Sequence, residues 1–354
     1  MLIYACISSH GFGHGSRSVA VLQQLARLRP TWRLVVSTAL PHSFLKLAFG
    51  HGEFEHRPCR WDVGVVQADA LGVDPQATLR QLEVMEASLP DQLEAELTWL
   101  EQQRLPVLVL GDVPPSAALL AARLGAPLVW LASFGWDAIY ASMGPELARR
   151  GEAARQLYGQ GDLLLSCPLN LPMDWGLPVQ PIGLTYSEPR PLAPAVLAEL
   201  ALPAERDRCV LISFGGLGLS LDPMLLARWP EHVFIGSDPA LAQAENGRLI
   251  PAGLRPLDLM PHAGRLLTKA GYSSFCEAFS QGVGIHLVER QGFAEAPVLA
   301  EALQNHGRHR LLSRSQLDQG EWQLDQPLLA ARQGPLPGAG AEAAAAALLT
   351  LLSS

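Results

Sequence analysis

Residues 8 to 17 read Ser-Ser-His-Gly-Phe-Gly-His-Gly-Ser-Arg, and this stretch indicates how the chain is organised. It follows the apolar run Leu2–Ile7, which is typical of a buried strand, and it precedes apolar residues at helical spacing from Val19 onward. A glycine-rich turn between a first strand and a first helix normally lies at the carboxyl edge of a parallel sheet, facing a ligand. His10 and His14 lie within this turn. Because a loop that only holds phosphate needs no imidazole, the two histidines indicate proton chemistry.

Apolar runs of strand length recur along the chain and alternate with helical segments. Short, non-alternating apolar strands separated by helices are typical of a parallel sheet covered on both faces. The runs predict strands at residues 2–7, 32–37, 107–110, 127–132, 209–213, 233–236, 266–269 and 285–288. Helices are expected at residues 77–103 with a break or kink at Pro90, at residues 115–124 and at residues 341–352.

Prolines are frequent between Pro178 and Pro203, which places a linker near residues 187–194. The length of 354 residues is also sufficient for two domains of ordinary size. We therefore predict an α/β fold with two doubly wound Rossmann-like domains facing a cleft. They comprise residues 1–186 and 187–354, and the last helix is expected to pack back across the domains.

The composition excludes several classes of protein. With 49% hydrophobic and 17% charged residues the chain can bury a large core, and a net charge of −8 argues against nucleic-acid binding. The first residues do not resemble a secretory signal, and no apolar run is long enough to span a membrane, although peripheral membrane contact stays open. The cysteines occur singly, which favours reduced thiols in a cytoplasmic protein over disulfides or a zinc site: Cys6, Cys59, Cys167, Cys209 and Cys276.

Asp112 follows the strand expected at residues 107–110, and two interpretations of it are open. It could cap the next helix, or its carboxylate could orient His14, because the ends of parallel strands converge at one edge of a sheet. A carboxylate bonded to one ring nitrogen fixes the histidine tautomer and raises the basicity of the other nitrogen. For His10, a structural role and a functional role are equally open.

The glycines of the opening stretch are weak evidence by themselves. Gly11, Gly13 and Gly15 form G-x-G-x-G, whereas the dinucleotide fingerprint is G-x-G-x-x-G. No Walker lysine follows them, so the sequence excludes a P-loop.

Two segments of the second half repeat the pattern of a strand followed by glycine. Ser213-Phe-Gly-Gly216 places bare backbone amides where a diphosphate could approach, and Lys269–Ala278 runs from a strand end through a glycine turn into a helix. Ser274 and Glu277 match an S-x-x-E capping box. Alternatively, the hydroxyls and amides of this helix start hold a phosphate while Glu277 accepts ribose hydroxyls. Residues 289–295 fit either a solvated turn or contacts to a bound sugar.

Six segments together carry a family resemblance: His10–Gly15, Val66–Leu71, Asp112–Pro114, Ser133–Tyr140, Ser213–Gly216 and Lys269–Glu277. Over nearly its whole length the chain resembles the GT-B glycosyltransferases. These include the family of the peptidoglycan N-acetylglucosaminyltransferase and the UDP-glucuronosyl and UDP-glucosyltransferases. The strings HGFGH, VQADAL and FGWDAIY also resemble the glycosyltransferase-like N-terminal region of plant L-arabinokinase.

The resemblance implies a metal-independent hexosyltransferase in which His14 deprotonates the acceptor hydroxyl and Asp112 orients it. His10, Gly13 and Gly15 would lie on the acceptor side, and the acceptor would be a small molecule or a lipid. No cofactor is implied, since the nucleotide sugar, expected to be UDP-linked, is a co-substrate. The residues expected at its diphosphate and ribose are Gly215, Gly216, Lys269, Gly271, Tyr272, Ser273, Ser274 and Glu277, and those at its sugar are Phe293 and Glu295.

Two departures from the family keep other functions open. Lys269-Ala-Gly-Tyr272 stands where many relatives carry His-x-Gly or Ser-Gly, and residues 289–295 lack the Asp-Gln pair common among UDP-sugar enzymes. The chain therefore also fits a non-catalytic sugar-nucleotide-binding or regulatory module, or a nucleotide-sugar epimerase or hydrolase on the same fold. The sequence has no Gly/Ser-rich kinase phosphate loop, so the resemblance does not imply arabinokinase activity.

Overall fold

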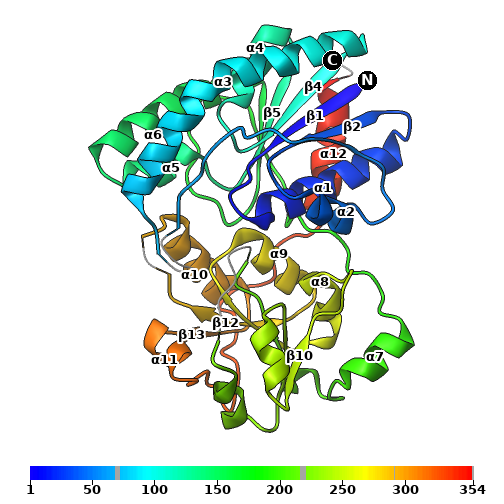
Figure 1. Cartoon of the computed structure of the whole chain (residues 1–354), viewed down its shortest axis with the longest axis vertical. Helices are drawn as coiled ribbons and strands as arrows, with labels where there is room; N and C mark the ends of the chain where they lie inside the picture. Colours follow the sequence, from blue (N-terminus) through cyan, green and yellow to red (C-terminus); the bar gives the residue numbers. More distant parts are fainter. Residues whose placement is uncertain (68–71, 216–220, 291, 353–354) are drawn as a thin grey trace. The chain divides into compact units, whose positions relative to one another are not determined.

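The computed structural model describes residues 1–67, 72–215, 221–290 and 292–352, and the chain divides into two compact units. Of the described residues, the first unit comprises 1–67, 73–186 and 337–352. The second comprises Gly72, 187–215, 221–290 and 292–336. Each unit is built on a parallel sheet with helices, as labelled in Figure 1. The predicted class, α/β with doubly wound parallel sheets, is therefore confirmed.

The first unit contains a seven-stranded sheet in the order β3-β2-β1-β4-β5-β6-β7. Its strands are β1 (Leu2–Ile7), β2 (Arg33–Ser37), β3 (Glu55–Arg57), β4 (Val107–Asp112), β5 (Leu128–Ala132), β6 (Leu163–Ser166) and β7 (Val179–Pro181). The chain begins in the middle of the sheet, adds β2 and β3 on one side, and then crosses to β4 on the other. The strand order thus reverses between β1 and β4. In open parallel sheets, ligands bind beyond the carboxyl ends of the strands at such a point.

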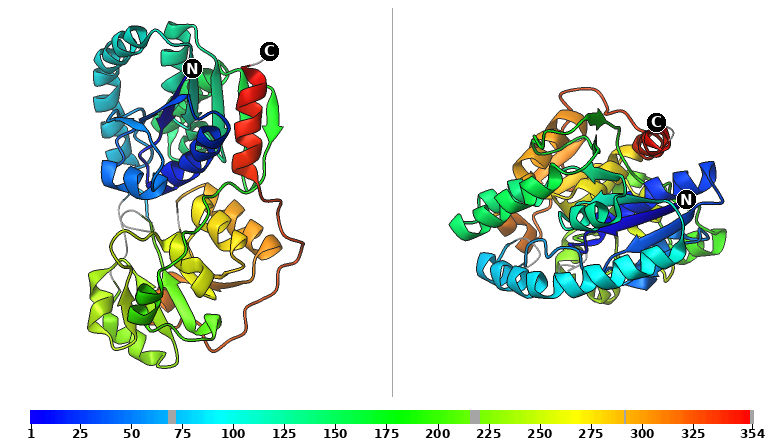
Figure 2. Two further views of the ribbon diagram at one scale, coloured as in Figure 1. Left: turned by 90° about the vertical axis from the view of Figure 1, so that its right-hand side faces the viewer. Right: turned by 90° about the horizontal axis from the view of Figure 1, so that it is seen from above.

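The helices of this unit are α1 (Phe12–Leu28), α2 (His42–Phe49), α3 (Pro75–Gln103), α4 (Ala117–Leu124), α5 (Trp136–Ala141), α6 (Pro145–Tyr158) and α12 (Gly340–Leu351). The last of them, red in Figure 2, returns from the far end of the sequence and lies against α1, where Gln24 Nε2 donates to Glu342 Oε1 at 2.8 Å. Of the break or kink expected at Pro90, the break is wrong, because α3 continues through this residue. Within the described part of the chain, no helix has the length and hydrophobicity of a membrane span.

Helix α1 begins earlier than the apolar spacing indicates. Its N-cap is Gly11, with φ of 80°, so Gly13, His14 and Gly15 belong to the helix and only residues 8–11 form the turn. Gly15 is required by packing: a Cβ there would lie 2.6 Å from Phe44 Cε1 on α2. The helix therefore approaches α2 closely, and His14 is carried by a helical turn, with no flexible loop beneath it.

The second unit contains a six-stranded sheet in the order β10-β9-β8-β11-β12-β13. Its strands are β8 (Cys209–Ile212), β9 (Val233–Gly236), β10 (Gly247–Leu249), β11 (Arg265–Lys269), β12 (Gly284–Val288) and β13 (His309–Leu312). Its α-helices are α7 (Pro194–Leu200), α8 (Pro256–Leu259), α9 (Tyr272–Ser280), α10 (Glu295–His306) and α11 (Arg314–Asp318). The order reverses between β8 and β11, which is the second point where a ligand is expected. A core that includes Phe234 and Trp322 packs within this unit.

The end of β4 depends on a close contact with β5. Gly111 lies opposite Trp130, and a Cβ at Gly111 would lie 2.3 Å from Trp130 Cζ3. The Trp130 ring is fully buried, and its Nε1 donates to Tyr158 O at 2.9 Å, so it has no room to move aside. Gly111 therefore allows the large ring to pack beside the residue that precedes Asp112.

We expect Gly111→Ala to lower the free energy of unfolding by about 1–3 kcal/mol, the usual cost of overpacking a core. Urea titration followed by circular dichroism measures this change. Gly334→Ala is the matched control, because nothing lies within 4 Å of a Cβ at that position. Equal stability of the two variants would contradict the packing argument.

Candidate functional site

The first reversal point brings His14 and Asp112 together. Asp112 is the last residue of β4, and His14 lies in the first turn of α1, whose N-cap follows β1 by a few residues. His14 Nδ1 is 2.9 Å from Asp112 Oδ1, and the two side chains are 8% and 0% exposed. The N-cap interpretation of Asp112 is wrong, because α4 begins at Ala117 and its N-cap is Ser116.

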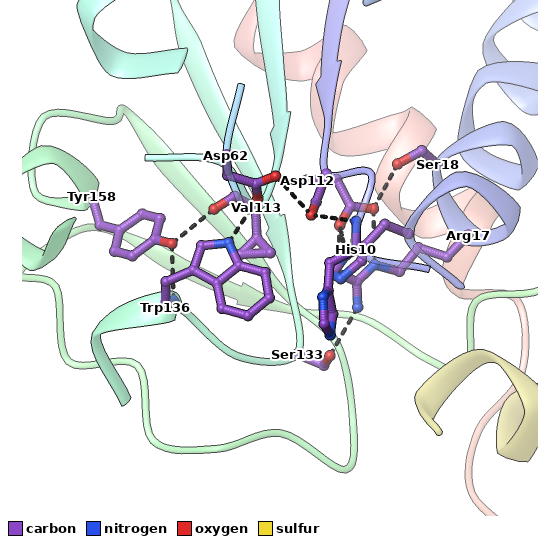
Figure 3. Close-up of polar contacts among 11 residues, drawn as sticks. His10, Arg17, Ser18, Asp62, Asp112, Val113, Ser133, Trp136 and Tyr158 are labelled. Carbon is purple, nitrogen blue, oxygen red and sulfur yellow. Dashed lines mark hydrogen bonds and ion pairs between the residues drawn. The ribbon is translucent and has the colours of Figure 1, made fainter. Parts of the chain in front are cut away.

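Asp112 is also bound by two further residues of α1. Arg17 Nε donates to Asp112 Oδ2 at 2.9 Å, Arg17 Nη2 donates to Oδ1 at 2.5 Å, and Ser18 Oγ donates to Oδ2 at 2.6 Å. On the other side, Arg17 Nη1 donates at 2.8 Å to Ser133 Oγ, just after β5. We call His14, Arg17, Ser18, Asp112 and Ser133 the Asp112 cluster. Figure 3 labels Arg17, Ser18, Asp112 and Ser133 and shows the polar contacts among them.

The charges of this cluster keep Asp112 ionised. Burial by itself raises the pKa of the Asp112 carboxyl, but the Arg17 charge and the hydrogen bonds from Arg17 and His14 outweigh it and hold the pKa at about 2. An ionised carboxylate only accepts hydrogen bonds, so its contact with His14 requires a hydrogen on Nδ1. The neutral ring then presents an unprotonated Nε2, which is the arrangement of a general base.

A second buried carboxylate lies close to the Asp112 cluster. Asp62 Oδ1 accepts from Ser8 Oγ at 3.0 Å, and Asp62 Oδ2 accepts from Trp136 Nε1 at 2.7 Å (Figure 3). Burial raises the pKa of the Asp62 carboxyl above its usual value, against these two bonds. The Trp136 ring lies 6.4 Å from the His14 ring, and the Phe134 ring meets His14 edge-on at 5.6 Å. His14 is thus enclosed by aromatic rings on this side.

His10 also contacts the aromatic wall but with a different hydrogen-bond pattern. Its Nδ1 accepts from the Val65 N–H at 3.3 Å, and its ring is edge-on to Trp136 at 5.2 Å. Because Nδ1 accepts, the neutral His10 ring carries its hydrogen on Nε2, the opposite tautomer to His14. The half-buried Gly13 lies between the two histidines in the sequence, in the first turn of α1.

In the second unit, the two predicted glycine segments meet at the reversal point between β8 and β11. Thr268 Oγ1 donates to Ser213 O at 2.6 Å and joins the two strand ends. Gly215, with φ of 78°, has Lys269 Cε 3.8 Å from where its Cβ would lie. Gly216, also predicted at this site, lies outside the described residues.

Helix α9 begins at Tyr272, with Gly271 as N-cap and without a side-chain cap. The predicted capping box of Ser274 and Glu277 is therefore wrong, and Glu277 lies in the second turn. Ser273 and Ser274 occupy the first turn. A Cβ at Gly271 would meet no atom closer than 3.9 Å, so no atom packs tightly against this side of the N-cap residue. The N–H groups of such a terminus attract anions.

Glu277 is half-buried, and among the described residues its carboxylate accepts no hydrogen bond. Burial raises the pKa of the Glu277 carboxyl to about 7; Arg255 acts against this shift and Asp258 adds to it. The Arg255 side chain also binds the buried Asp258, through Nε and Nη2. The arrangement leaves a carboxylate with acceptor capacity beside the α9 N-terminus.

The residues expected at a sugar are both buried, so the solvated-turn interpretation is wrong for them. Phe293 is 6% exposed, with the Arg290 guanidinium 4.0 Å above its ring, and Glu295 is 4% exposed at the first position of α10. In the part of the chain that the structure describes, no group of three or more His, Cys, Asp or Glu side chains is arranged to hold a metal ion.

The sequence interpretation missed Arg17, Ser18 and Ser133. Helical spacing carried a signal for the first two, because His14, Arg17 and Ser18 are three and four residues apart and share one face of α1 with the core residues Val21 and Leu25. A charged residue on a core-facing stripe needs a buried partner. Asp62 and Trp136 gave no such signal, since their contact depends on how two loops fold.

We expect Glu277→Gln to raise the free energy of unfolding well above pH 7 and to change it little below pH 4.5. The pKa of the Glu277 carboxyl rises from 4.5 to about 7 on folding. Below pH 4.5 this carboxyl is neutral in the folded and the unfolded protein, as glutamine is, so the substitution changes little. As the pH rises from 4.5 to about 7 the unfolded protein releases the proton more readily, and the wild-type protein loses stability that the glutamine variant keeps. Urea titrations at the two pH values measure the difference. Glu301→Gln, on the exposed part of α10, is the control, and an equal effect in both variants would contradict the account.

Comparisons with known proteins give one curated relative and many similar structures. The chain is 28% identical over 326 residues to an L-arabinokinase of Arabidopsis thaliana; the match covers 89% of this chain and 31% of that protein. The chain thus spans about a third of the length of this relative. No protein-family model matches.

The similar structures share the fold at low sequence identity. Arabidopsis thaliana UGT89C1 complexed with quercetin has a TM-score of 0.63 and 15% identity, covering 92% of this chain and 90% of that one. Phytolacca americana UGT2 complexed with UDP-2fluoro-glucose and pterostilbene has a TM-score of 0.61 and 14% identity, covering 92% and 88%. A UDP-glucosyltransferase from Polygonum tinctorium capable of glucosylating indoxyl has a TM-score of 0.61 and 14% identity, also covering 92% and 88%.

Proposed function

We propose that this chain, which has the GT-B fold of UDP-glycosyltransferases, transfers a sugar from a nucleotide-diphosphate sugar to a hydroxyl of a small-molecule or lipid acceptor. The observation that carries the proposal is the contact of His14 with Asp112 at the carboxyl edge of the first sheet. In our proposal His14 is the base and Asp112 orients it. The donor is UDP-linked, as in solved structures of similar fold complexed with UDP or UDP-L-rhamnose.

In the proposed reaction, His14 Nε2 takes the proton of the acceptor hydroxyl while the hydroxyl oxygen bonds to the anomeric carbon of the donor sugar. The bond between that carbon and the phosphate oxygen breaks, and the nucleoside diphosphate leaves. Asp112 stabilises the positive charge that forms on the His14 ring.

The second unit offers groups suited to the donor. The N–H groups at the α9 N-terminus, the bare backbone at Gly215 and the Lys269 side chain would meet the diphosphate charge without a metal ion. Glu277 has acceptor capacity for the ribose hydroxyls. Phe293 and Glu295 would contact the sugar, and His10 and the α1 glycines would lie on the acceptor side.

Binding and turnover distinguish the proposed function from its alternatives. UDP and UDP-sugars are expected to raise the melting temperature more than ADP or GDP, because a ligand stabilises the folded state that binds it. A chain that binds a UDP-sugar without releasing UDP under any acceptor would be a binding module. One that consumes the donor without releasing nucleotide would be an epimerase, and one that releases free sugar with water alone would be a hydrolase.

We expect His14→Ala to slow acceptor-dependent UDP release by roughly 10²–10⁴-fold while leaving the thermal shift by UDP intact, because a general base acts on the chemical step. Coupled detection of UDP measures the rate. His51→Ala, at an exposed position after α2, is the control. Full activity of His14→Ala would remove the base assignment, and the absence of any response to nucleotides would contradict the proposal as a whole.

A further inference from the structure

We propose that Arg17 is a positioning residue that fixes the Asp112 carboxylate, and through it the Nδ1–H tautomer of His14. The tautomer follows from the contacts of the Asp112 cluster, whereas the consequence for catalysis rests on the proposed function. The Arg17 side chain is 2% exposed, so its guanidinium binds groups of the protein interior and not solvent.

The Asp112 carboxylate has no acceptor capacity left. An ionised carboxylate offers about four lone-pair positions, and Asp112 receives four donors: His14 Nδ1 and Arg17 Nη2 on Oδ1, Arg17 Nε and Ser18 Oγ on Oδ2. Because the guanidinium binds both oxygens, it holds the plane of the carboxylate. Arg17 and Ser18 take three of the four acceptor positions, so the imidazole can bind only at the fourth, on Oδ1. This contact also determines the orientation of the ring.

Arg17 is itself held from two directions. Its backbone belongs to α1, one turn beyond His14, and its Nη1 donates to Ser133 Oγ at the end of β5. The positive charge of the guanidinium also balances the buried carboxylate, which would otherwise be costly to desolvate. A lysine would supply the charge but not the planar two-point contact.

The distances around His14 Nδ1 are compatible with either tautomer of the neutral ring. Arg17 Nη2 lies 3.1 Å from His14 Nδ1, while both atoms lie within hydrogen-bond distance of Asp112 Oδ1. If Arg17 donated to Nδ1, the ring hydrogen would be on Nε2 and His14 could not take a proton there. The ionised carboxylate is the stronger acceptor. We therefore infer that both donors point at Asp112 Oδ1 and that Nδ1 keeps its hydrogen.

Nitrogen-15 NMR of the histidine rings tests this inference on the intact chain without a substrate. The spectrum of nitrogen-15 histidine-labelled protein, with the His14 signal assigned from its loss in His14→Gln, should show a protonated Nδ1 and an unprotonated Nε2. A His14 ring with its hydrogen on Nε2 in the wild-type protein would overturn the proposal. This outcome is independent of whether the protein transfers sugar.

Variants of Arg17 test its role directly. In Arg17→Lys the His14 signals should move toward a mixture of both tautomers, and in Arg17→Met the change should be larger. If Arg17→Met does not fold, as judged by circular dichroism, Arg17→Lys decides the outcome alone. Arg57→Lys is the matched control, because Arg57 binds both oxygens of the buried Glu96 away from His14. An unchanged His14 tautomer in Arg17→Lys would overturn the proposal.

Activity gives a second readout that a merely structural role would not move. Arg17→Lys should lower kcat for UDP release by at least roughly 10-fold, because a misoriented base loses part of its ~10²–10⁴-fold contribution, while KM for the donor stays unchanged. Arg57→Lys should keep both constants. If wild-type protein releases no UDP, the proposed function fails while the NMR result still decides the role of Arg17. If the wild-type protein is active, a normal kcat in Arg17→Lys would overturn the positioning role of Arg17.

Discussion

The buried carboxylate of Asp112 is the constraint on which the rest of the first unit depends. It is fully buried at the end of a central strand, and removing an ion from water is costly unless every lone pair is used. Here α1 supplies all four donors, from His14, Arg17 and Ser18, and Ser133 after β5 holds the guanidinium from the opposite side. The opening motif is therefore best understood as a helix built to satisfy one carboxylate. His14, to which we assign the role of base, is one of the residues that supply these donors.

The second unit also contains a buried carboxylate, Asp258, and there two arginines bind it. Asp258 is also fully buried, and Arg190 and Arg255 bind both of its oxygens; although burial raises the pKa of this carboxyl, the arginines hold it at about 2. Arg190 lies at the start of the unit, so the bond fixes the incoming chain onto α8. Burial raises the pKa of the Glu277 carboxyl to about 7, and the charge of Arg255, which binds Asp258, acts against this rise without cancelling it. The same pairing thus anchors the backbone and leaves an acceptor beside the α9 N-terminus.

Much of the fold was predictable from the sequence because buried parallel strands are continuous apolar runs. The expected strands at residues 2–7 and 233–236 agree with β1 and β9 to the residue. The short edge strands β3 and β7 were not predicted, since three residues that are half-buried in β3 and exposed in β7 give no apolar run. The start of α1 and the cap of α9 were misplaced because glycine, a poor helix former, occupies the first turn of one helix and the cap of the other.

The contact between His14 and Asp112 could be anticipated because Asp112 ends β4 and the turn before His14 follows the neighbouring strand β1. The contacts of Arg17 and Asp62, in contrast, depend on packing. A double-mutant cycle on the rate of acceptor-dependent UDP release tests the central claim, that His14 and Asp112 act as one unit, most directly. The account predicts that His14→Ala combined with Asp112→Asn is no slower than His14→Ala alone. Losses that add as independent factors would contradict it.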